Sequence, residues 1–332
     1  MILTFEKMIL RLLLIAGFIF VSCSDDAKDE LNSSSVEKSI TANTRDTIVR
    51  IPVDNYEIPV YLSIPEGCEG QTMPAVVIMH GSDGMWTNND PSSGIMSGQF
   101  RQWQSFLSEN CIVSAFVDSY ASRGVLTRTG KWRELPDNFR ISAQFERPKD
   151  ANAALLLLQN LTYEDGSPVV ESKDVGLLGF SDGGSAVAGT MLDLDRVPEG
   201  FEWSQSQDGK DYDSSDGILP PQPKPAIGFS GAVSYYPGSV GYNYYGKHPC
   251  SSEALDGNIF YPYAPMLFQI PSDDRLTENT LCLVDVLKAK SAPVEMNYYE
   301  GVPHGFDFDG LPETETARKR TLEWFTKLWA EN

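Results

Sequence analysis

The chain has 332 residues, of which 41% are apolar and 22% are charged. These values are typical of a globular protein with one large domain and a substantial core. The formal net charge is −20, from 26 Lys and Arg against 46 Asp and Glu. A net negative charge of this size repels nucleic acid, and the sequence contains no cluster of Lys or Arg that could bind it. We therefore expect no nucleic-acid partner. No His and Cys pattern has the spacing of a zinc site, and we predict neither a metal nor another cofactor.

Residues 1–22 have the pattern of a signal peptide. Lys7 and Arg11 precede the apolar run 12–21, which is too short to span a bilayer. The run ends at Phe20-Val21-Ser22-Cys23, which resembles a bacterial lipobox, in which the cysteine is lipid-modified and becomes the new N-terminus. We therefore predict lipidation at Cys23, and the alternative is an ordinary signal peptide followed by a coincidental cysteine.

Residues 23–47 are predicted to form a flexible tether, because they are polar and contain few large apolar side chains. The acidic stretch 24–30 resembles the surface-export signals of bacterial lipoproteins. We expect an exported protein, anchored by lipid to the outer membrane and facing the periplasm or the cell surface.

Four cysteines follow Cys23, and an exported protein is free to form disulfides. They are Cys68, Cys111, Cys250 and Cys282. Three complete pairings are open from the sequence. We favour Cys250 with Cys282, because both lie in the C-terminal half near segments expected to converge, and four buried thiols are the alternative.

Apolar runs alternate with helical patterns from residue 48 to the C-terminus. This alternation predicts an α/β domain over 48–332, with a mostly parallel sheet covered by helices on both faces. Strands are expected at 48–53, 58–64, 75–79, 112–117, 175–179, 228–235, 266–270 and 294–299. Helices are expected at 98–109, 149–161, 182–194, 277–289 and 312–329.

Two irregular stretches, about 193–225 and 238–263, interrupt this alternation. The first is acidic and rich in proline, and the second is rich in Tyr and Gly. We expect both as insertions following strands on the C-terminal side of the sheet, where open α/β sheets bind their ligands. There they would shape substrate selectivity, and surface decoration is an equally weighted alternative.

The strongest chemical signal is Gly179-Phe180-Ser181-Asp182-Gly183, between an apolar strand pattern and a run of small residues. Strand, sharp turn and helix form the setting of a nucleophile elbow. The glycines allow the tight turn, and the serine oxygen is exposed at the start of the helix. The pattern predicts Ser181 as a nucleophile.

A serine nucleophile needs a base, and the chain has three histidines. His304 follows the strand expected at 294–299 and precedes the last helix, the position from which this kind of fold delivers its base. His80 ends an early strand, where a histidine supports the loop backbone. His248 lies in the second insertion and is the weaker candidate.

The third member is expected to be an acid between Ser181 and His304, just after a strand. Asp273 is our prediction, Asp274 is the second choice, and Asp307 comes too late in the chain. The alternative is that Asp273 or Asp274 only caps the following helix.

Acyl transfer also requires N–H donors for the developing oxyanion. We predict the backbone N–H of Asp182 as one donor and that of Ser82, in the loop after the strand 75–79, as the other.

Together these motifs resemble the dienelactone hydrolase family of the α/β-hydrolase superfamily, over roughly residues 48–329. The matching segments are His80-Gly81-Ser82-Asp83-Gly84, Val117-Asp118-Ser119-Tyr120 with Arg123-Gly124, the elbow at Ser181, Ser272-Asp273-Asp274, and Pro303-His304-Gly305-Phe306. The resemblance implies that the segment 118–124 lies beside the site, where we expect Asp118 and Arg123 to brace the loop. The founding enzymes use a cysteine nucleophile, so Ser181 points to the broad esterase branch.

The resulting hypothesis is hydrolysis of a carboxylic ester, with a small-molecule or glycan-linked ester as substrate. A peptidase of the same fold is one alternative, although the chain has no propeller-sized N-terminal domain. A non-catalytic surface-binding lipoprotein that keeps the fold is another, and the presence of a candidate nucleophile, base and acid argues against it.

Overall fold

The computed structural model describes residues 46–68, 70–127, 139–207, 210–237 and 240–332. The predicted signal peptide, Cys23 and nearly all of the predicted tether lie outside the described residues. The first strand, β1 (Asp46–Val53), begins two residues earlier than expected. Within the described residues, no helix combines the length and the apolar character needed to cross a membrane.

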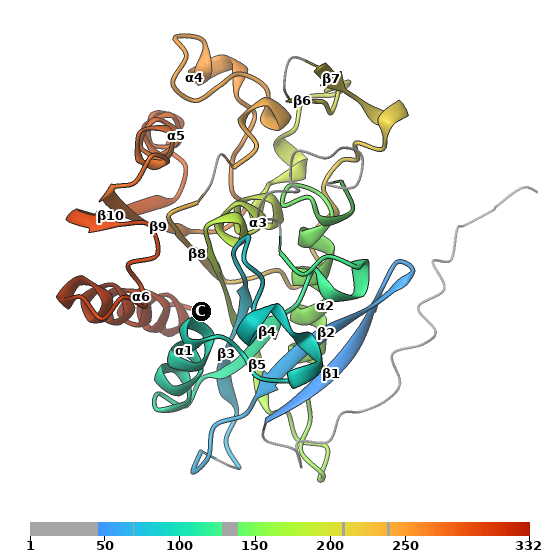
Figure 1. Cartoon of the computed structure of the whole chain (residues 1–332), viewed down its shortest axis with the longest axis vertical. Coiled ribbons are helices and arrows are strands. Elements are labelled where there is room, and N and C mark those ends of the chain that lie inside the picture. The colour runs from blue at the N-terminus through green and yellow to red at the C-terminus, as the bar shows by residue number, and fades with distance from the viewer. Residues whose placement is uncertain (1–45, 69, 128–138, 208–209, 238–239) are drawn as a thin grey trace, which may run out of the picture. The chain divides into compact units, whose positions relative to one another are not determined.

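The central sheet contains eight strands in the order β1-β2-β4-β3-β5-β8-β9-β10 (Figure 1). The others are β2 (Tyr56–Ser63), β3 (Met73–Met79), β4 (Val113–Val117), β5 (Val170–Phe180), β8 (Gly231–Tyr235), β9 (Met266–Asp273) and β10 (Val294–Pro303). β2 pairs antiparallel with both β1 and β4, and the strands from β4 to β10 run parallel. Each predicted strand corresponds to one of these eight.

Both faces of the sheet are covered, which explains why its inner strands appear as unbroken apolar runs in the sequence. Successive side chains of a strand point to opposite faces. In β3, Ala75, Val77 and Met79 join one apolar core, whereas Val76 and Ile78 join the other. The predicted α/β architecture is therefore confirmed.

Five of the helices supply the cover, and all five were predicted from periodicity. α2 (Arg147–Gln159), α3 (Asp182–Met191) and α5 (Thr277–Ala289) contribute to the core of one face. α1 (Gly98–Ser108) and α6 (Pro312–Ala330) contribute to the core of the other. α6 approaches the sheet closely, because a Cβ on Gly176 would lie only 2.4 Å from the ring of Phe325.

The first insertion differs from its predicted position. It follows α3, which ends at Met191, rather than a strand. A helix that follows a parallel strand runs back along the sheet, so its C-terminus lies at the end opposite to the binding edge. The insertion contains a small antiparallel ribbon, β6 (Gln205–Gln207) and β7 (Lys210–Tyr212).

The second insertion does follow a strand, β8, and contains the short helix α4 (Ala254–Gly257). The two insertions pack together, since the rings of Trp203 and Tyr244 lie 4.9 Å apart and the Tyr244 hydroxyl donates to the carbonyl oxygen of Leu219. In Figure 1 the ribbon and α4 lie at the upper end of the view, away from α1 and α6.

Two disulfides join distant segments. Cys250 and Cys282, with Cα atoms 5.0 Å apart, connect the second insertion to α5, which confirms the favoured pairing. Cys68 and Cys111, 5.9 Å apart, connect the segment before β3 to the turn before β4. The alternative of four free thiols is therefore wrong.

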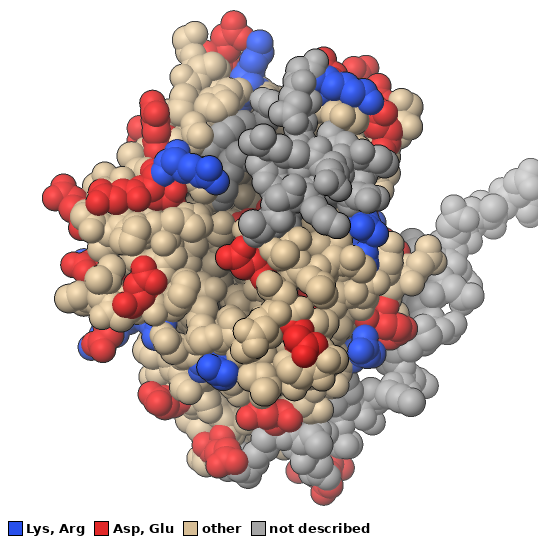
Figure 2. Space-filling model, in the orientation of Figure 1, with Lys and Arg blue, Asp and Glu red and all other residues tan. Residues whose placement is uncertain are grey.

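The described surface reflects the net charge. Figure 2 shows Asp and Glu side chains distributed over the visible face, whereas Lys and Arg lie as separate groups rather than as one patch. This distribution is unfavourable for polyanionic ligands on that face.

Candidate active site

Ser181 lies in the sharp turn between β5 and α3, with φ 53° and ψ −116°. This is a strained backbone conformation for a residue with a side chain. It is held by close packing: a Cβ on Gly179 would lie 2.3 Å from the carbonyl oxygen of Gly183, and one on Gly183 would lie 2.1 Å from that of Met79. Both flanking glycines are thus required by space, and the predicted elbow is present.

The imidazole of His304 reaches this serine from the loop that follows β10. Its Nε2 atom lies 3.0 Å from Ser181 Oγ, and its Nδ1 atom lies 2.5 Å from Asp274 Oδ2. The three side chains therefore form a continuous hydrogen-bonded chain, although 123 residues separate the serine from the histidine. This is the spatial order of nucleophile, base and acid.

The acid differs from the predicted one: His304 contacts Asp274 rather than Asp273. Asp273 is the last residue of β9, and its exposed carboxylate accepts a hydrogen bond from Ser272 Oγ. Consecutive residues at a strand end point in opposite directions. Asp274 therefore turns inward, with only 4% of its side chain exposed, and bonds the histidine.

The environment of Asp274 keeps its carboxyl group ionised. Burial raises its pKa, but hydrogen bonds from His304 and from the backbone N–H of Leu276 outweigh burial, so the pKa lies below its ordinary value. Asp274 also helps to start α5, because its backbone oxygen accepts from the N–H of Thr277. An ionised carboxylate at this position stabilises a protonated imidazole.

The loop after β3 runs beside the nucleophile. A Cβ on Gly81 would lie 3.5 Å from the Cβ atom of Ser181, so the backbone at Gly81 passes next to the serine. A turn closed by the N–H of Gly84 and the carbonyl oxygen of Gly81 contains Ser82. Asp182 is the first residue of α3, where backbone N–H groups have no acceptor within the helix. Oxyanion binding by Ser82 and Asp182 stays a prediction.

Solved structures share this arrangement of strands and helices. A protein from Klebsiella pneumoniae subsp. pneumoniae that is provisionally named a dienelactone hydrolase superimposes with a TM-score of 0.52, at 16% identity, over 85% of this chain and 98% of its own. Esterase 2 of Thermogutta terrifontis, in a form with propionate bound, superimposes with a TM-score of 0.53, at 16% identity, over 86% of this chain and 94% of its own.

The chain has the α/β-hydrolase fold. The same Thermogutta esterase phosphonylated by cyclosarin matches equally well, with a TM-score of 0.53 and 16% identity over 85% and 94% of the two chains. No family model and no curated protein matches the chain. The resemblance to the dienelactone hydrolase family, drawn from the sequence motifs, agrees with the match to the Klebsiella protein.

His80 has the supporting role expected for it in the hydrolase fold. Its Nε2 atom accepts the N–H of Ser119 at 3.2 Å, which leaves Nδ1 to donate to the carbonyl oxygen of Gly81 at 2.7 Å. Burial and the nearby Arg147 lower the pKa of His80 to about 4. His80 is therefore neutral at physiological pH and holds the loop backbone.

Asp118 and Arg123 brace the next loop, as predicted. Asp118 accepts the N–H groups of Tyr120 and Ala121. Arg123 forms a bidentate pair with Asp150, with both contacts between 2.7 and 2.8 Å and both side chains fully buried. The segment 118–124 is thus held in place by backbone hydrogen bonds to Asp118 and by the buried ion pair of Arg123 with Asp150.

His304 rests on a support that sequence reasoning missed. The ring of Tyr236 lies 4.5 Å from the ring of His304, and the Tyr236 hydroxyl donates to Asp307. Asp307 is buried and also accepts from Trp103 Nε1 at 2.8 Å and from Gln99. This carboxylate anchors the loop below His304, which agrees with leaving Asp307 out of the triad. The only signal for Asp307 in the sequence was its position three residues after His304.

His248 lies outside this arrangement. Its Nδ1 atom accepts the N–H of Cys250 within the second insertion, at 3.1 Å. His248 was the weaker candidate for the base, and the histidine that contacts Ser181 is His304.

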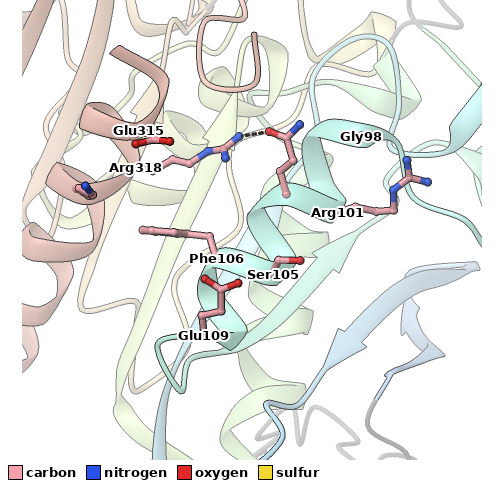
Figure 3. Close-up of a pocket in the computed structure, with 9 residues that line it drawn as sticks. Gly98, Arg101, Ser105, Phe106, Glu109, Glu315 and Arg318 are labelled. Carbon is pink, nitrogen blue, oxygen red and sulfur yellow. Dashed lines mark hydrogen bonds between the residues drawn. The ribbon is translucent and has the colours of Figure 1, made fainter. Parts of the chain in front are cut away.

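A groove of about 540 Å³ lies between α1 and α6 (Figure 3). Its lining includes Arg101, Ser105, Phe106 and Glu315 but none of the three triad side chains. Arg318, on its wall, donates to Gln102 at 2.6 Å and to the backbone oxygen of Asp307. The groove is therefore separate from the nucleophile. Within the described residues, no group of three or more His, Cys, Asp and Glu side chains is arranged to hold a metal ion.

Proposed function

We propose that this protein is a serine hydrolase that cleaves carboxylic esters through an acyl-enzyme intermediate. The observation that carries the proposal is the hydrogen-bonded chain from Ser181 through His304 to Asp274, with the serine at a strained elbow. Esterase 2 of Thermogutta, which has the same fold, has been captured with propionate bound and in a phosphonylated form, and both states suit acyl chemistry.

In the first half of the reaction, Ser181 Oγ forms a bond to the ester carbonyl carbon while its proton passes to His304 Nε2. The carbonyl electron pair moves to oxygen, and the resulting oxyanion is held by the N–H groups of Asp182 and Ser82. When the tetrahedral intermediate collapses, the leaving alkoxide takes the proton from His304 and departs as the alcohol. Asp274 keeps the imidazole oriented and stabilises its charge.

In the second half, water takes the place of the alcohol. It loses a proton to His304 and attacks the acyl-enzyme carbonyl, and collapse of the second intermediate returns the proton to Ser181 and releases the carboxylic acid. Ester and water are converted to acid and alcohol, with no net change in the enzyme. The acidic surface makes neutral esters better candidate substrates than polyanionic ones.

The test is turnover of a panel of p-nitrophenyl esters by soluble protein that begins after Cys23. Ser181→Ala is expected to lower turnover by several powers of ten, because triad nucleophiles contribute up to about 10⁶-fold. A fluorophosphonate probe should label wild-type protein and not the variant. Full activity of Ser181→Ala would contradict the proposal.

Peptide anilides included in the same panel distinguish a peptidase of this fold. Faster turnover of anilides than of short acyl esters would replace the esterase assignment by a peptidase one. Absence of both turnover and labelling would favour a binding lipoprotein that has kept only the fold.

We also propose that the protein is exported and lipid-anchored through Cys23. The two disulfides support an oxidising compartment, because cytosolic thiols are kept reduced. Labelling with a radioactive fatty acid should mark the wild-type protein and not Cys23→Ser. Equal labelling of both would contradict the anchor.

A further inference from the structure

A negative charge lies next to the proposed oxyanion site. Asp182 supplies one of the two N–H groups, and its own carboxylate is only 12% exposed. An unpaired carboxylate at this position would repel the oxyanion that forms in the transition state, and the weak screening of a partly buried site would make the repulsion strong. The fold therefore needs a positive charge at Asp182.

Arg147, the first residue of α2, supplies that charge. Its Nη1 atom lies 2.6 Å from Asp182 Oδ2, and its side chain is fully buried. The hydroxyl of Tyr120 donates to the same carboxylate oxygen at 2.9 Å, and the guanidinium lies over the Tyr120 ring, 5.2 Å from its centre. The carboxylate of Asp182 is thus neutralised by the Arg147 guanidinium, which is held in place by that carboxylate and by the Tyr120 ring.

The same guanidinium also reaches the other side of the oxyanion site. Its Nη2 atom donates to the carbonyl oxygen of His80 at 2.5 Å. His80 directly precedes Gly81, whose backbone passes beside Ser181, and Ser82 is the next residue. One side chain therefore ties the segment carrying the Ser82 N–H to the helix end carrying the Asp182 N–H.

We propose that Arg147 is a positioning residue for the oxyanion site, which holds its two N–H donors in one geometry and neutralises the carboxylate of Asp182. The inference rests on the proposed ester hydrolysis. It distinguishes Arg147 from the other buried arginine of this region, because Arg123 pairs with Asp150 and contacts Ser119, but neither Asp182 nor the carbonyl oxygen of His80.

The test compares Arg147→Met, Asp182→Asn and the double variant, with kcat and KM measured on p-nitrophenyl acetate. Arg147→Met should lower kcat by about 10²- to 10³-fold, the effect of losing an oxyanion donor, and change KM by less than about fivefold. The double variant should recover at least tenfold in kcat over Arg147→Met, because it removes the uncompensated carboxylate. The kcat values are expressed per Ser181 site that a fluorophosphonate labels, because a structural role alone would lower the number of labelled sites and leave kcat per site unchanged.

Lys149→Met is the matched control. Lys149 lies on the same helix and pairs with Asp54 and Glu146, away from the elbow, so its loss should leave kcat within about twofold. Arg147→Lys should fall between wild type and Arg147→Met, because an ammonium group keeps the charge but lacks the fork that spans both partners.

The double variant and Asp182→Asn keep the proposal falsifiable if Arg147→Met does not fold, because replacing both members of a buried pair is far less harmful than removing one. Asp182→Asn should retain at least one tenth of wild-type kcat. A loss above a hundredfold would overturn the proposal, since it would show that the carboxylate assists the reaction. A double variant whose loss in kcat equals the product of the two single-variant losses would also overturn the proposal.

The two proposals fail in different ways. Wild-type protein without ester turnover or Ser181 labelling would refute the proposed function and the Arg147 proposal with it. Wild-type turnover that depends on Ser181, combined with normal kcat in Arg147→Met, would refute the Arg147 proposal alone.

Discussion

The two halves of the candidate site are built in opposite ways. The acid–base half places His304 at the surface, with 40% of its side chain exposed, on a loop held by Asp274 and Tyr236. The proposed oxyanion half is buried, with His80 at 1% and Arg147 at 0% exposure. A proton carrier must meet substrate and water, whereas donors to an oxyanion work best when they are fixed beforehand in a dry surrounding. Substitutions in the first half should therefore affect catalysis with little loss of stability, whereas substitutions in and around the buried half should also lower stability.

The largest effect expected after that of Ser181→Ala separates the two adjacent acids. Asp274→Asn should lower kcat for p-nitrophenyl acetate by about 10⁴-fold, because the amide does not stabilise the imidazolium and favours the wrong tautomer. Asp273→Asn is the matched control and should remain within about threefold of wild type, since Asp273 contacts Ser272 and not His304. A larger loss of kcat in Asp273→Asn than in Asp274→Asn would show that Asp273, the residue predicted from the sequence, is the acid.

The next effect is on stability. Arg123→Met leaves the buried carboxylate of Asp150 without its partner, which should lower the free energy of unfolding by about 3–5 kcal/mol. Lys149→Met removes pairs with the half-exposed Asp54 and with Glu146 and should cost less, about 1 kcal/mol. Urea unfolding followed by circular dichroism measures both. Equal losses would show that the buried pair is not the stronger brace.

The smallest effect concerns pH. Burial and Arg147 lower the pKa of His80 to about 4, below its ordinary value of 6.5. Between these values the unfolded chain binds a proton that the folded chain does not, so the free energy of unfolding falls as the pH falls, by up to about 1.4 kcal/mol per pH unit. Above pH 6.5 this contribution is constant.

Urea unfolding at several pH values between 7 and 4 tests the contribution of His80. His80→Gln keeps an acceptor for the N–H of Ser119 and should give a flatter curve than wild type over this range. His248→Gln is the control and should keep the wild-type slope. Identical slopes for all three proteins would assign the acid sensitivity to other groups.

The strands, helices and elbow were accessible from the sequence because their causes are local. Periodicity reports which faces of an element are buried, and the glycines at 179 and 183 report a turn that has no room for a Cβ. The order of nucleophile, acid and base along the chain also followed, since the loops at the carboxyl ends of parallel strands meet at one edge of the sheet.

The remaining choices required the tertiary structure, because they depend on where side chains point and on contacts between distant segments. Whether Asp273 or Asp274 faces His304 depends on the residue at which β9 ends. The bridge from Arg147 to Asp182 and His80 joins three elements, and nothing in the sequence near Arg147 indicates it. Sequence determined which chemical groups this protein brings to the sheet edge, and packing decided which of them touch.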